Sequence, residues 1–239
     1  MTPDETARGV SCIIPAFNEG PRIAAVLAVV TSHPLIAEVI VVDDGSTDDT
    51  AAIAENFATV QLIRMDQNGG KSRSLAAGFA RAREPHVLLV DSDLEGLRAE
   101  DLTSLIQPVL DGRADMTISL RGNAPSLWRW IGVDYISGER MFRRSLIEDR
   151  LRDLGQLPRF GCEIWINRVC LSAAARIAVV GWPNVASPTK NRKRGFAAGI
   201  NADLRMMADL FRSASAFEIL RQIWAMRKSS VASAKGKFG

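Results

Sequence analysis

Short apolar runs alternate along the chain with longer stretches in which apolar residues recur at helical spacing. The apolar runs are rich in Val, Ile and Leu and have the length of buried strands: Val10 to Ala16, Val39 to Asp43, Val60 to Met65, Val87 to Val90 and Met116 to Leu120. The segments between them have helical composition: Pro21 to Thr31, Asp48 to Phe57 and Lys71 to Arg83. This alternation predicts an α/β fold with a doubly wound, mainly parallel sheet.

The second half of the chain is less regular. The segment from Pro125 to Arg152 is rich in Trp and Arg, and its composition predicts mostly helix. The elements expected beyond it are two strands, Ile177 to Val180 and Trp182 to Ala186, and two helices near residues 200–213 and 216–228. We therefore predict one domain over residues 1–199, with C-terminal helices and a basic tail over residues 200–239.

Composition limits the class of protein. The chain has 239 residues, of which 47% are hydrophobic and 24% charged, enough for one sizeable core. Its three cysteines form no C-x-x-C pair, so a zinc site or disulfide framework is not expected, and a reducing, cytoplasmic location fits best. The polar N-terminus has no apolar segment typical of a signal peptide, and no run of about 18 apolar residues predicts a membrane span.

Charge is distributed unevenly along the chain. Residues 190–239 hold eleven Lys or Arg and three Asp or Glu, a charge of +8, whereas the remaining residues carry −5. A basic C-terminal region on an acidic body predicts an anionic partner for that region.

Acidic side chains follow the fourth predicted strand, in the run VLLVDSDLE. In parallel sheets ligands bind beyond the carboxyl ends of the strands. If the strand continued, Asp91 and Asp93 would point to the same side, with Ser92 opposite, and could share one divalent ion. Oxygen ligands suit Mg²⁺ or Mn²⁺, and Glu95 is near enough in sequence to add a third. The alternative is a solvated turn with helix-capping aspartates.

Two other loops at the same sheet edge carry polar groups. Asp43 and Asp44 end the second strand, and we favour Asp44 as the acceptor of hydrogen bonds from a base or ribose. Lys71 opens a helix after two glycines, which suits an anionic ligand. The fragment GGKS is not a P-loop, because Met65 stands where G-x-x-x-x-G-K-[ST] requires glycine. No G-x-G-x-x-G follows the first strand, which disfavours a dinucleotide-binding fold.

Taken together, IIPAFNE, VVDDGSTDDT, NGGKSRSLAAG and VDSDLEGL resemble, in order and spacing, the motifs of family 2 glycosyltransferases of the GT-A fold. The resemblance covers about residues 10–120. Within that family, the chain is most similar to the dolichyl- or polyprenyl-phosphate sugar synthases. It implies a GT-A type sheet whose nucleotide-sugar half spans about residues 10–122 and whose acceptor half spans about 123–199. The residues expected to bind the UDP- or GDP-sugar are Pro15, Phe17, Glu19, Val42, Asp44, Lys71, Asp91, Ser92, Asp93 and Arg121, with Asp91, Asp93 and Glu95 as metal ligands.

The resemblance extends to two basic elements of the second half. The segment ISGERMFRR resembles the S-G-x-R element of that family, which implies that Arg140 lies near the reacting phosphates. The basic loop resembles a phosphate-binding segment, and the residues expected to contact the acceptor phosphate there are Lys190, Arg192, Lys193 and Arg194.

The resemblance implies direct displacement with inversion at the anomeric carbon, and Asp93, Arg140 and Glu163 are the catalytic candidates. A hydroxyl acceptor needs a general base, for which Glu163 is the first candidate, since burial would raise its pKa, and Asp134 and Asp149 are weaker ones. A phosphate acceptor needs cations instead. The many basic residues favour transfer to a polyprenyl phosphate. The alternatives are a hydroxyl of a soluble or glycan acceptor and a non-catalytic nucleotide-sugar-binding module.

The last predicted helix, SAFEILRQIWAMRK, carries an apolar stripe bordered by cationic side chains. The stripe consists of Phe217, Leu220, Ile223, Trp224 and Met226, and the border of Arg221, Arg227 and Lys228. Such a helix is typical of contact with a membrane surface, here the cytoplasmic face, but an ordinary helix packed on the domain has the same pattern. A nucleic-acid partner is disfavoured, because no loop interleaves aromatic and basic residues.

Overall fold

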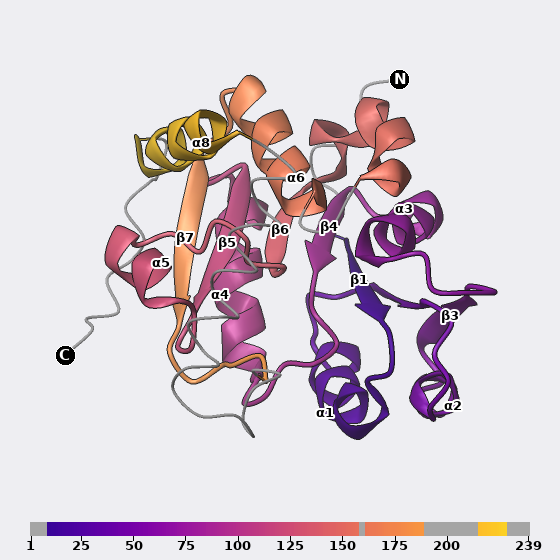
Figure 1. Ribbon diagram of the computed structural model, residues 1–239. Helices are drawn as coiled ribbons and strands as arrows, with labels where there is room; N and C mark the ends of the chain where they lie inside the picture. The colour runs from indigo at the N-terminus through magenta and orange to yellow at the C-terminus, as the bar shows by residue number, and fades with distance from the viewer. Residues whose placement is uncertain (1–8, 158–160, 189–214, 229–239) are drawn as a thin grey trace, which may run out of the picture.

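A computed structural model describes residues 9–157, 161–188 and 215–228. Its centre is a seven-stranded sheet with the strand order β3-β2-β1-β4-β6-β5-β7 (Figure 1). The strands are β1 (Val10–Ala16), β2 (Glu38–Asp43), β3 (Val60–Arg64), β4 (His86–Leu89), β5 (Met116–Arg121), β6 (Arg140–Arg143) and β7 (Ile177–Trp182). All neighbouring pairs are parallel except the two that involve β6, which runs antiparallel to β4 and to β5. The predicted doubly wound, mainly parallel sheet is therefore confirmed.

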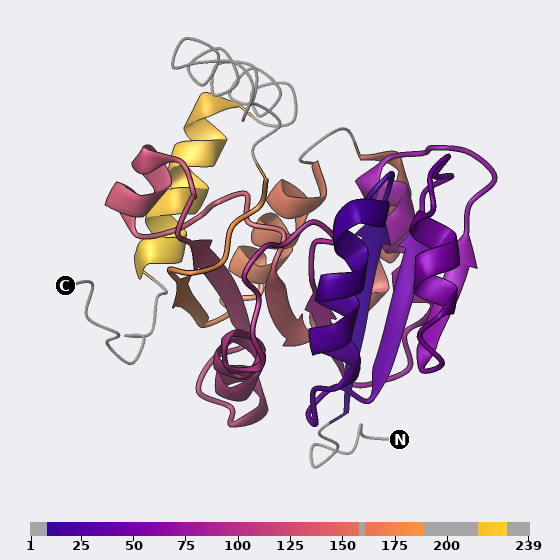
Figure 2. The ribbon, with the colours of Figure 1, turned by 90° about the horizontal axis from the view of Figure 1, so that it is seen from below.

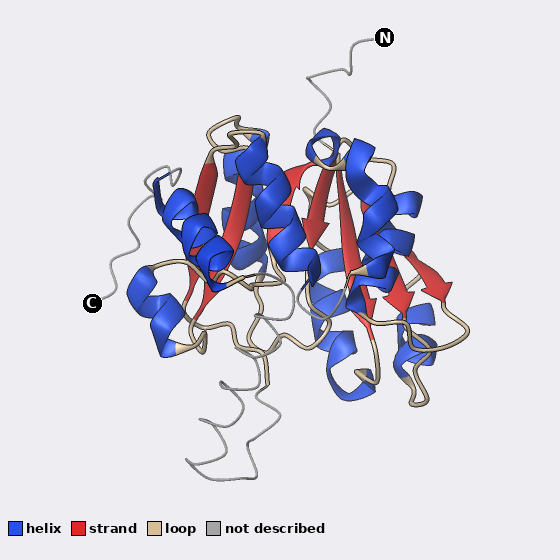
Figure 3. Cartoon of the chain, turned by 45° about the horizontal axis from the view of Figure 1, so that its top comes forward, coloured by secondary structure: helices blue, strands red, loops and turns tan. Residues whose placement is uncertain are grey.

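Helices cover both faces of the sheet and make three layers (Figures 2 and 3). The α-helices are α1 (Gly20–Thr31), α2 (Thr50–Glu55), α3 (Lys71–Arg81), α4 (Ala99–Leu110), α5 (Ser126–Ile131), α6 (Gly161–Ser172) and α8 (Ala216–Lys228), and the 3₁₀ segments are η1 (Arg144–Leu146) and η2 (Glu148–Gln156). Successive side chains of β1 point to opposite faces of the sheet and belong to two hydrophobic cores. Cys12 and Ile14 pack with α1 and α4, whereas Ile13 packs with α3 and α6. This is the period-two pattern of a strand buried on both faces.

Helix α1 illustrates how the pattern of apolar residues determines the packing. Its buried residues, Ile23, Val26, Leu27 and Val30, recur at the three- and four-residue spacing of one helix face. Two main-chain amides at the start of α1 donate to side chains that follow β2. Thr50 Oγ1 accepts from Glu19 N at 2.8 Å, and Asp48 Oδ2 accepts from Gly20 N at 3.0 Å. The loops after β1 and β2 therefore form one connected unit at the sheet edge.

The helical prediction for Pro125 to Arg152 was wrong. Only Ser126–Ile131 is α-helical there; β6 and the 3₁₀ segments follow. Arg140, Met141 and Phe142 are fully buried between two strands, where hydrogen bonding to both neighbours outweighs local helical preference. The two predicted strands after residue 176 are one strand, β7, and Ala186 forms only an isolated bridge to Glu95.

The C-terminal helix α8 agrees with the predicted 216–228 segment, and the helix predicted at 200–213 lies outside the described residues. Helix α8 packs on α6, where Arg168 Nη2 lies 2.6 Å from Glu218 Oε1. Tyr135 Oη also donates to Gln222 Oε1 at 2.9 Å. Within the described ranges, no helix is both long and apolar enough to cross a bilayer.

Candidate active site

The carboxyl ends of β1, β2, β4 and β5 meet at one edge of the sheet, where the start of the antiparallel β6 joins them. The loops after β1 and β2 are bound together, since Ser46 Oγ accepts from Asn18 N and Asn18 Oδ1 accepts from Thr47 N, each at 2.9 Å. Asn18 has a φ of 55°, a left-handed conformation that asparagine tolerates. A pocket of about 530 Å³ borders this loop, with Asp43 and Arg64 in its walls.

Asp44 is buried and holds the loop that begins α3. Its Oδ1 accepts from Gly69 N at 2.9 Å and its Oδ2 from Gly70 N at 2.8 Å. Gly70 has a φ of 85°, which favours glycine immediately before Lys71. Asp44 was predicted to bind base or ribose; in this structure its two oxygens fix the position from which the Lys71 side chain starts.

Lys71 joins two parts of the site. Its Nζ lies 2.6 Å from Asp91 Oδ1, after β4, and 3.1 Å from Glu163 Oε1, on α6. Burial lowers the pKa of this ammonium, but the two carboxylates outweigh burial and hold its pKa well above the ordinary value. The thiol of Cys162 donates to Glu163 Oε2 at 2.8 Å, so both carboxylate oxygens of Glu163 have partners. The sequence indicated each residue separately but not this bridge.

Asp91 and Asp93 differ in their electrostatic surroundings. The strand alternation expected for them does not apply, because β4 ends at Leu89 and a turn follows. Burial raises the pKa of Asp91, but Lys71 and Arg121 outweigh it, so the pKa lies below its ordinary value. Burial and the negative charges of Asp91 and Glu19 raise the pKa of Asp93 to about 6. The negative charge of Asp91 is therefore compensated by neighbouring cations, whereas Asp93 is surrounded by an excess of negative charge.

This excess of negative charge is what a divalent cation relieves. Mg²⁺ is commonly held by one or two carboxylates together with substrate phosphates, so Asp91 and Asp93 fit Mg²⁺ or Mn²⁺. Glu95 is exposed, and its main chain pairs with Ala186 at 2.8 and 3.0 Å. In the described part of the chain, no three histidine, cysteine or acidic side chains are arranged to hold a metal together, so the role of Glu95 as a third ligand stays a prediction.

Arg121, at the end of β5, faces a group of buried acids. Its guanidinium lies 3.4 Å from Glu139 and 3.5 Å from Asp134, and it also donates to Ser187 Oγ. Burial raises the pKa of Asp134 to about 6, although Arg121 opposes this shift. Asp134 is fully buried, and its Oδ1 has no hydrogen-bond partner among the described residues, so it is poorly placed as a base for an acceptor.

The residues just before β6 complete the rear of the site. A Cβ on Gly138 would come within 2.4 Å of Asp91 Oδ1, so only glycine allows the chain to pass this close to that carboxylate. Glu139 is fully buried and accepts from Ser119 Oγ and Ser137 Oγ, each at 2.7 Å. Sequence reasoning assigned no role to Gly138 or Glu139, although both lie in the segment ISGERMFRR whose resemblance indicated Arg140.

Arg140 faces the interior. It is fully buried and donates to the main-chain oxygens of Ser137 at 2.8 Å and Tyr135 at 3.0 Å, and to Asn167 Oδ1. A longer contact of 3.5 Å reaches the main-chain oxygen of Glu163. The Arg140 guanidinium thus lies in the interior between β6 and α6, and the proximity to the reacting phosphates that the resemblance implied stays a prediction.

The other predicted residues are distributed as follows. Pro15 lies within β1, opposite Val42 of β2. The pairing of β1 with β4 ends at Ile13, so the missing N–H of Pro15 interrupts no hydrogen bond to β4. Val42 is fully buried in the core, Ser92 is buried and Phe17 is exposed. Asp149, in η2, is exposed.

The predicted basic residues, Lys190, Arg192, Lys193 and Arg194, lie outside the described residues. The chain before them is held beside Arg121, because Asn123 Nδ2 donates to the main-chain oxygen of Ser187 at 2.6 Å.

Two curated relatives illustrate what the chain is similar to. A dodecaprenyl-phosphate galacturonate synthase of Rhizobium johnstonii is 27% identical over 191 residues, which are 69% of this chain and 56% of the relative. A 4,4'-diaponeurosporenoate glycosyltransferase of Staphylococcus aureus is 36% identical over 103 residues, 41% of this chain and 28% of the relative. The matched region thus spans less than two-thirds of the length of either relative.

Solved structures share the fold. Glucosyl-3-phosphoglycerate synthase from Mycobacterium tuberculosis, in complex with Mn²⁺, UDP and glucosyl-3-phosphoglycerate, has a TM-score of 0.64 and 24% identity, covering 86% of this chain and 80% of that chain. Its complex with Mg²⁺ and UDP has a TM-score of 0.67 and 23% identity, with 86% and 79% coverage. The predicted GT-A type fold is confirmed.

The model of one protein family matches most of the chain. The family is described as "Glycosyl transferase family 2", and the match covers residues 11–169. That region contains the sheet edge with Asp44, Lys71, Asp91, Asp93 and Glu163. The resemblance seen in the sequence motifs is confirmed, and the chain belongs to glycosyl transferase family 2.

Proposed function

We propose that this chain is an inverting glycosyltransferase that moves a sugar from a UDP- or GDP-linked donor to a polyprenyl phosphate. The observation that carries the proposal is the Lys71 bridge, which joins Asp91 to Glu163 and, together with the Cys162 thiol, leaves each Glu163 oxygen already hydrogen-bonded. The dodecaprenyl-phosphate acceptor in the name of one relative supports the same substrate class.

The donor diphosphate binds at the sheet edge beside Asp91 and Asp93. These two carboxylates would hold Mg²⁺ or Mn²⁺, which supplies charge neutralisation of the diphosphate leaving group when bound. Lys71, at the start of α3, and Arg121 add fixed positive charge at the same edge, and the N-terminus of α3 favours an anion. Phe17, exposed next to this edge, lies against the nucleoside.

The state of Glu163 favours an acceptor that is already ionised. A hydroxyl nucleophile must lose a proton to a base within hydrogen-bond reach. The Glu163 side chain is 5% exposed, with the Lys71 ammonium on one oxygen and the Cys162 thiol on the other. A phosphate monoester needs no base: its oxygen forms the new bond to the anomeric carbon while the bond to the diphosphate breaks, and the electron pair leaves with the nucleoside diphosphate.

Arg140 then has a positioning role. Its guanidinium binds Asn167 and the main-chain oxygen of Glu163, so it fixes α6 and with it the carboxylate that holds Lys71. The acceptor phosphate is met by the predicted basic residues, Lys190, Arg192, Lys193 and Arg194.

The second candidate is transfer of the same donor sugar to a hydroxyl of a soluble or glycan acceptor. It requires Lys71 to leave Glu163 when the donor binds, which would free Glu163 as the base. A third is a module that binds nucleotide-sugar without turnover.

Incubation with radiolabelled UDP- and GDP-sugars, Mn²⁺ and polyprenyl phosphate separates the three candidates. We expect label to enter the organic phase only when polyprenyl phosphate is present, and Glu163→Gln to retain much of that transfer. Label that stays in the aqueous phase as a glycoside identifies the hydroxyl reaction. Nucleotide binding without transfer to any acceptor identifies the binding module. Asp91→Asn with Asp93→Asn is the control for the site, and unchanged metal-dependent turnover in that variant would reject it.

A further inference from the structure

Helix α8 carries two separate apolar faces. Ile219, Ile223 and Met226 are buried on the face packed toward α6. On another face Phe217 is 77% exposed, Leu220 66% and Trp224 64%. The buried face fits the predicted packed helix, and contact of the exposed face with a surface stays a prediction.

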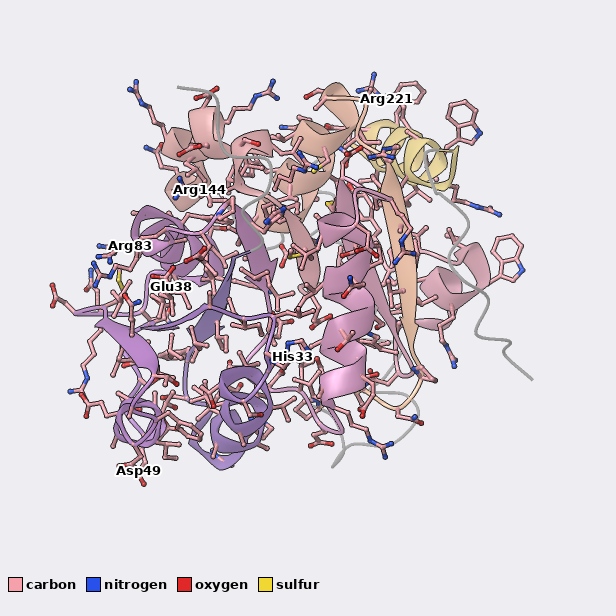
Figure 4. The ribbon with its side chains drawn as sticks, turned by 180° about the vertical axis from the view of Figure 1, so that it is seen from behind. His33, Glu38, Asp49, Arg83, Arg144 and Arg221 are labelled. Atoms are coloured by element: carbon pink, nitrogen blue, oxygen red, sulfur yellow. The ribbon has the colours of Figure 1, made fainter. Side chains whose placement is uncertain are left out.

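Cationic residues border the exposed face on both sides. At about 100° per residue, Phe217, Leu220 and Trp224 fall within about 60° of one another around the helix axis. On the same wheel, Arg221 falls on one side of this stripe and Arg227 on the other, and both are exposed. Figure 4 shows Arg221 on the outer side of α8. An apolar stripe between two cations is the arrangement of a helix lying in the interface of an anionic bilayer.

The short helix α5 carries another exposed aromatic residue. Trp130, on the short helix α5, is 83% exposed. Helices α5 and α8 both lie at the β7 end of the sheet (Figure 1). Among the described residues, four of the five exposed large apolar side chains therefore lie on these two helices, and Phe17 is the fifth.

We propose that the exposed face of α8 docks on the surface of an anionic lipid bilayer. Aromatic side chains with apolar bodies and polar edges favour the headgroup boundary. The arginines complement anionic headgroups, whereas an apolar protein partner would leave them without counter-charges. The charge of +8 over residues 190–239 has the same sign. This inference goes beyond the proposed function and does not depend on sugar transfer.

Flotation of the full chain with vesicles tests the docking. We expect binding to vesicles that contain phosphatidylglycerol, weak binding to vesicles of phosphatidylcholine alone, and less binding at high salt. Phe217→Ser with Trp224→Ser should weaken binding to anionic vesicles at least about tenfold, because two buried apolar groups are lost. Arg221→Gln should reduce the preference for phosphatidylglycerol, whereas its control Arg113→Gln, another exposed arginine away from α8, should not.

Circular dichroism and thermal melting of each variant separate lost docking from lost folding. Wild-type protein that does not float, or a folded Phe217→Ser, Trp224→Ser variant that floats like wild type, would overturn the proposal. So would sedimentation showing a wild-type dimer that this variant dissociates, since the face would then bind a second copy.

Activity distinguishes this proposal from the proposed function. Transfer to a short-chain prenyl phosphate dissolved in buffer should be the same in the wild type and in the Phe217→Ser, Trp224→Ser variant. Transfer to long-chain polyprenyl phosphate in vesicles should fall with vesicle binding. If neither acceptor is glycosylated, the proposed function fails while the vesicle result still decides the docking surface.

Discussion

The metal-free protein should become more stable when Asp93 is replaced by Asn. The pKa of Asp93 rises from an ordinary value of 3.8 to about 6 because its ionised form is buried beside the negative charges of Asp91 and Glu19. Between those pH values the folded protein binds more protons at this site than the unfolded chain does. Stability is therefore lost as the pH rises through that range, and the whole loss is present above about pH 6.

The size of the effect follows from the same shift. The pKa rises by about 2 pH units, which corresponds to about 3 kcal/mol at 1.36 kcal/mol per unit. Asp93 is only partly buried, so solvent screening reduces the figure to about 1–2 kcal/mol. Asparagine has the same shape without the charge. Asp93→Asn should accordingly gain about 1–2 kcal/mol of unfolding free energy at pH 8 and close to nothing at pH 4.

Urea unfolding in EDTA at a series of pH values measures this gain. The matched control is Asp66→Asn, which removes the charge of an exposed aspartate and should show no such pH dependence. Addition of Mn²⁺ and UDP should reverse the ranking, because only the wild type retains the carboxylate for the metal. A variant less stable than wild type at pH 8, or a gain that is the same at pH 4 and pH 8, would refute the reasoning.

Three further outcomes follow from single contacts. Lys71→Met leaves the buried Glu163 without its ammonium and should cost about 2–4 kcal/mol at pH 7 in urea unfolding, and adding Glu163→Gln should restore most of it. Gly138→Ala should displace the Asp91 carboxylate and weaken binding of Mn²⁺ and UDP by at least about tenfold in calorimetry, while unfolding changes by less than about 2 kcal/mol. Figure 4 labels Glu38, whose carboxylate accepts three hydrogen bonds. Burial raises the pKa of Glu38, but these hydrogen bonds outweigh burial and lower the pKa below its ordinary value. The ionised Glu38 therefore stabilises the folded protein above about pH 4.5, and this stabilisation is lost on acidification. Glu38→Gln should therefore cost about 1–3 kcal/mol at pH 7, and less at pH 3.

The donor half of the molecule was predictable because its signals are local. Each strand is a short run of β-branched and aliphatic residues, and each loop at its carboxyl end holds the polar residues within a few positions. The parallel-sheet rule then places Asp44, Lys71 and Asp91 at one edge without knowledge of any contact. The structure confirms that edge for all three residues.

The acceptor half was not predictable in the same way. Strand β6 has only four residues, and neither its antiparallel direction nor its position between β4 and β5 is encoded in local periodicity. The contact of Lys71 with Glu163 joins α3 to α6, whose separation along the chain is large, so only tertiary packing determines it. For the same reason local sequence did not indicate that Arg140, predicted near the reacting phosphates, is buried against α6.

Strand β6 also couples unfolding of the sheet to loss of donor binding. It is the strand through which β3-β2-β1-β4 on one side and β5-β7 on the other are hydrogen-bonded into one sheet. Gly138 and Glu139 enter the carboxylate cluster directly before this strand. Partial unfolding that detaches β6 would therefore separate the two halves and remove the support behind Asp91 in one event. Donor binding and integrity of the sheet should consequently be lost together, with no intermediate that retains the nucleotide site alone.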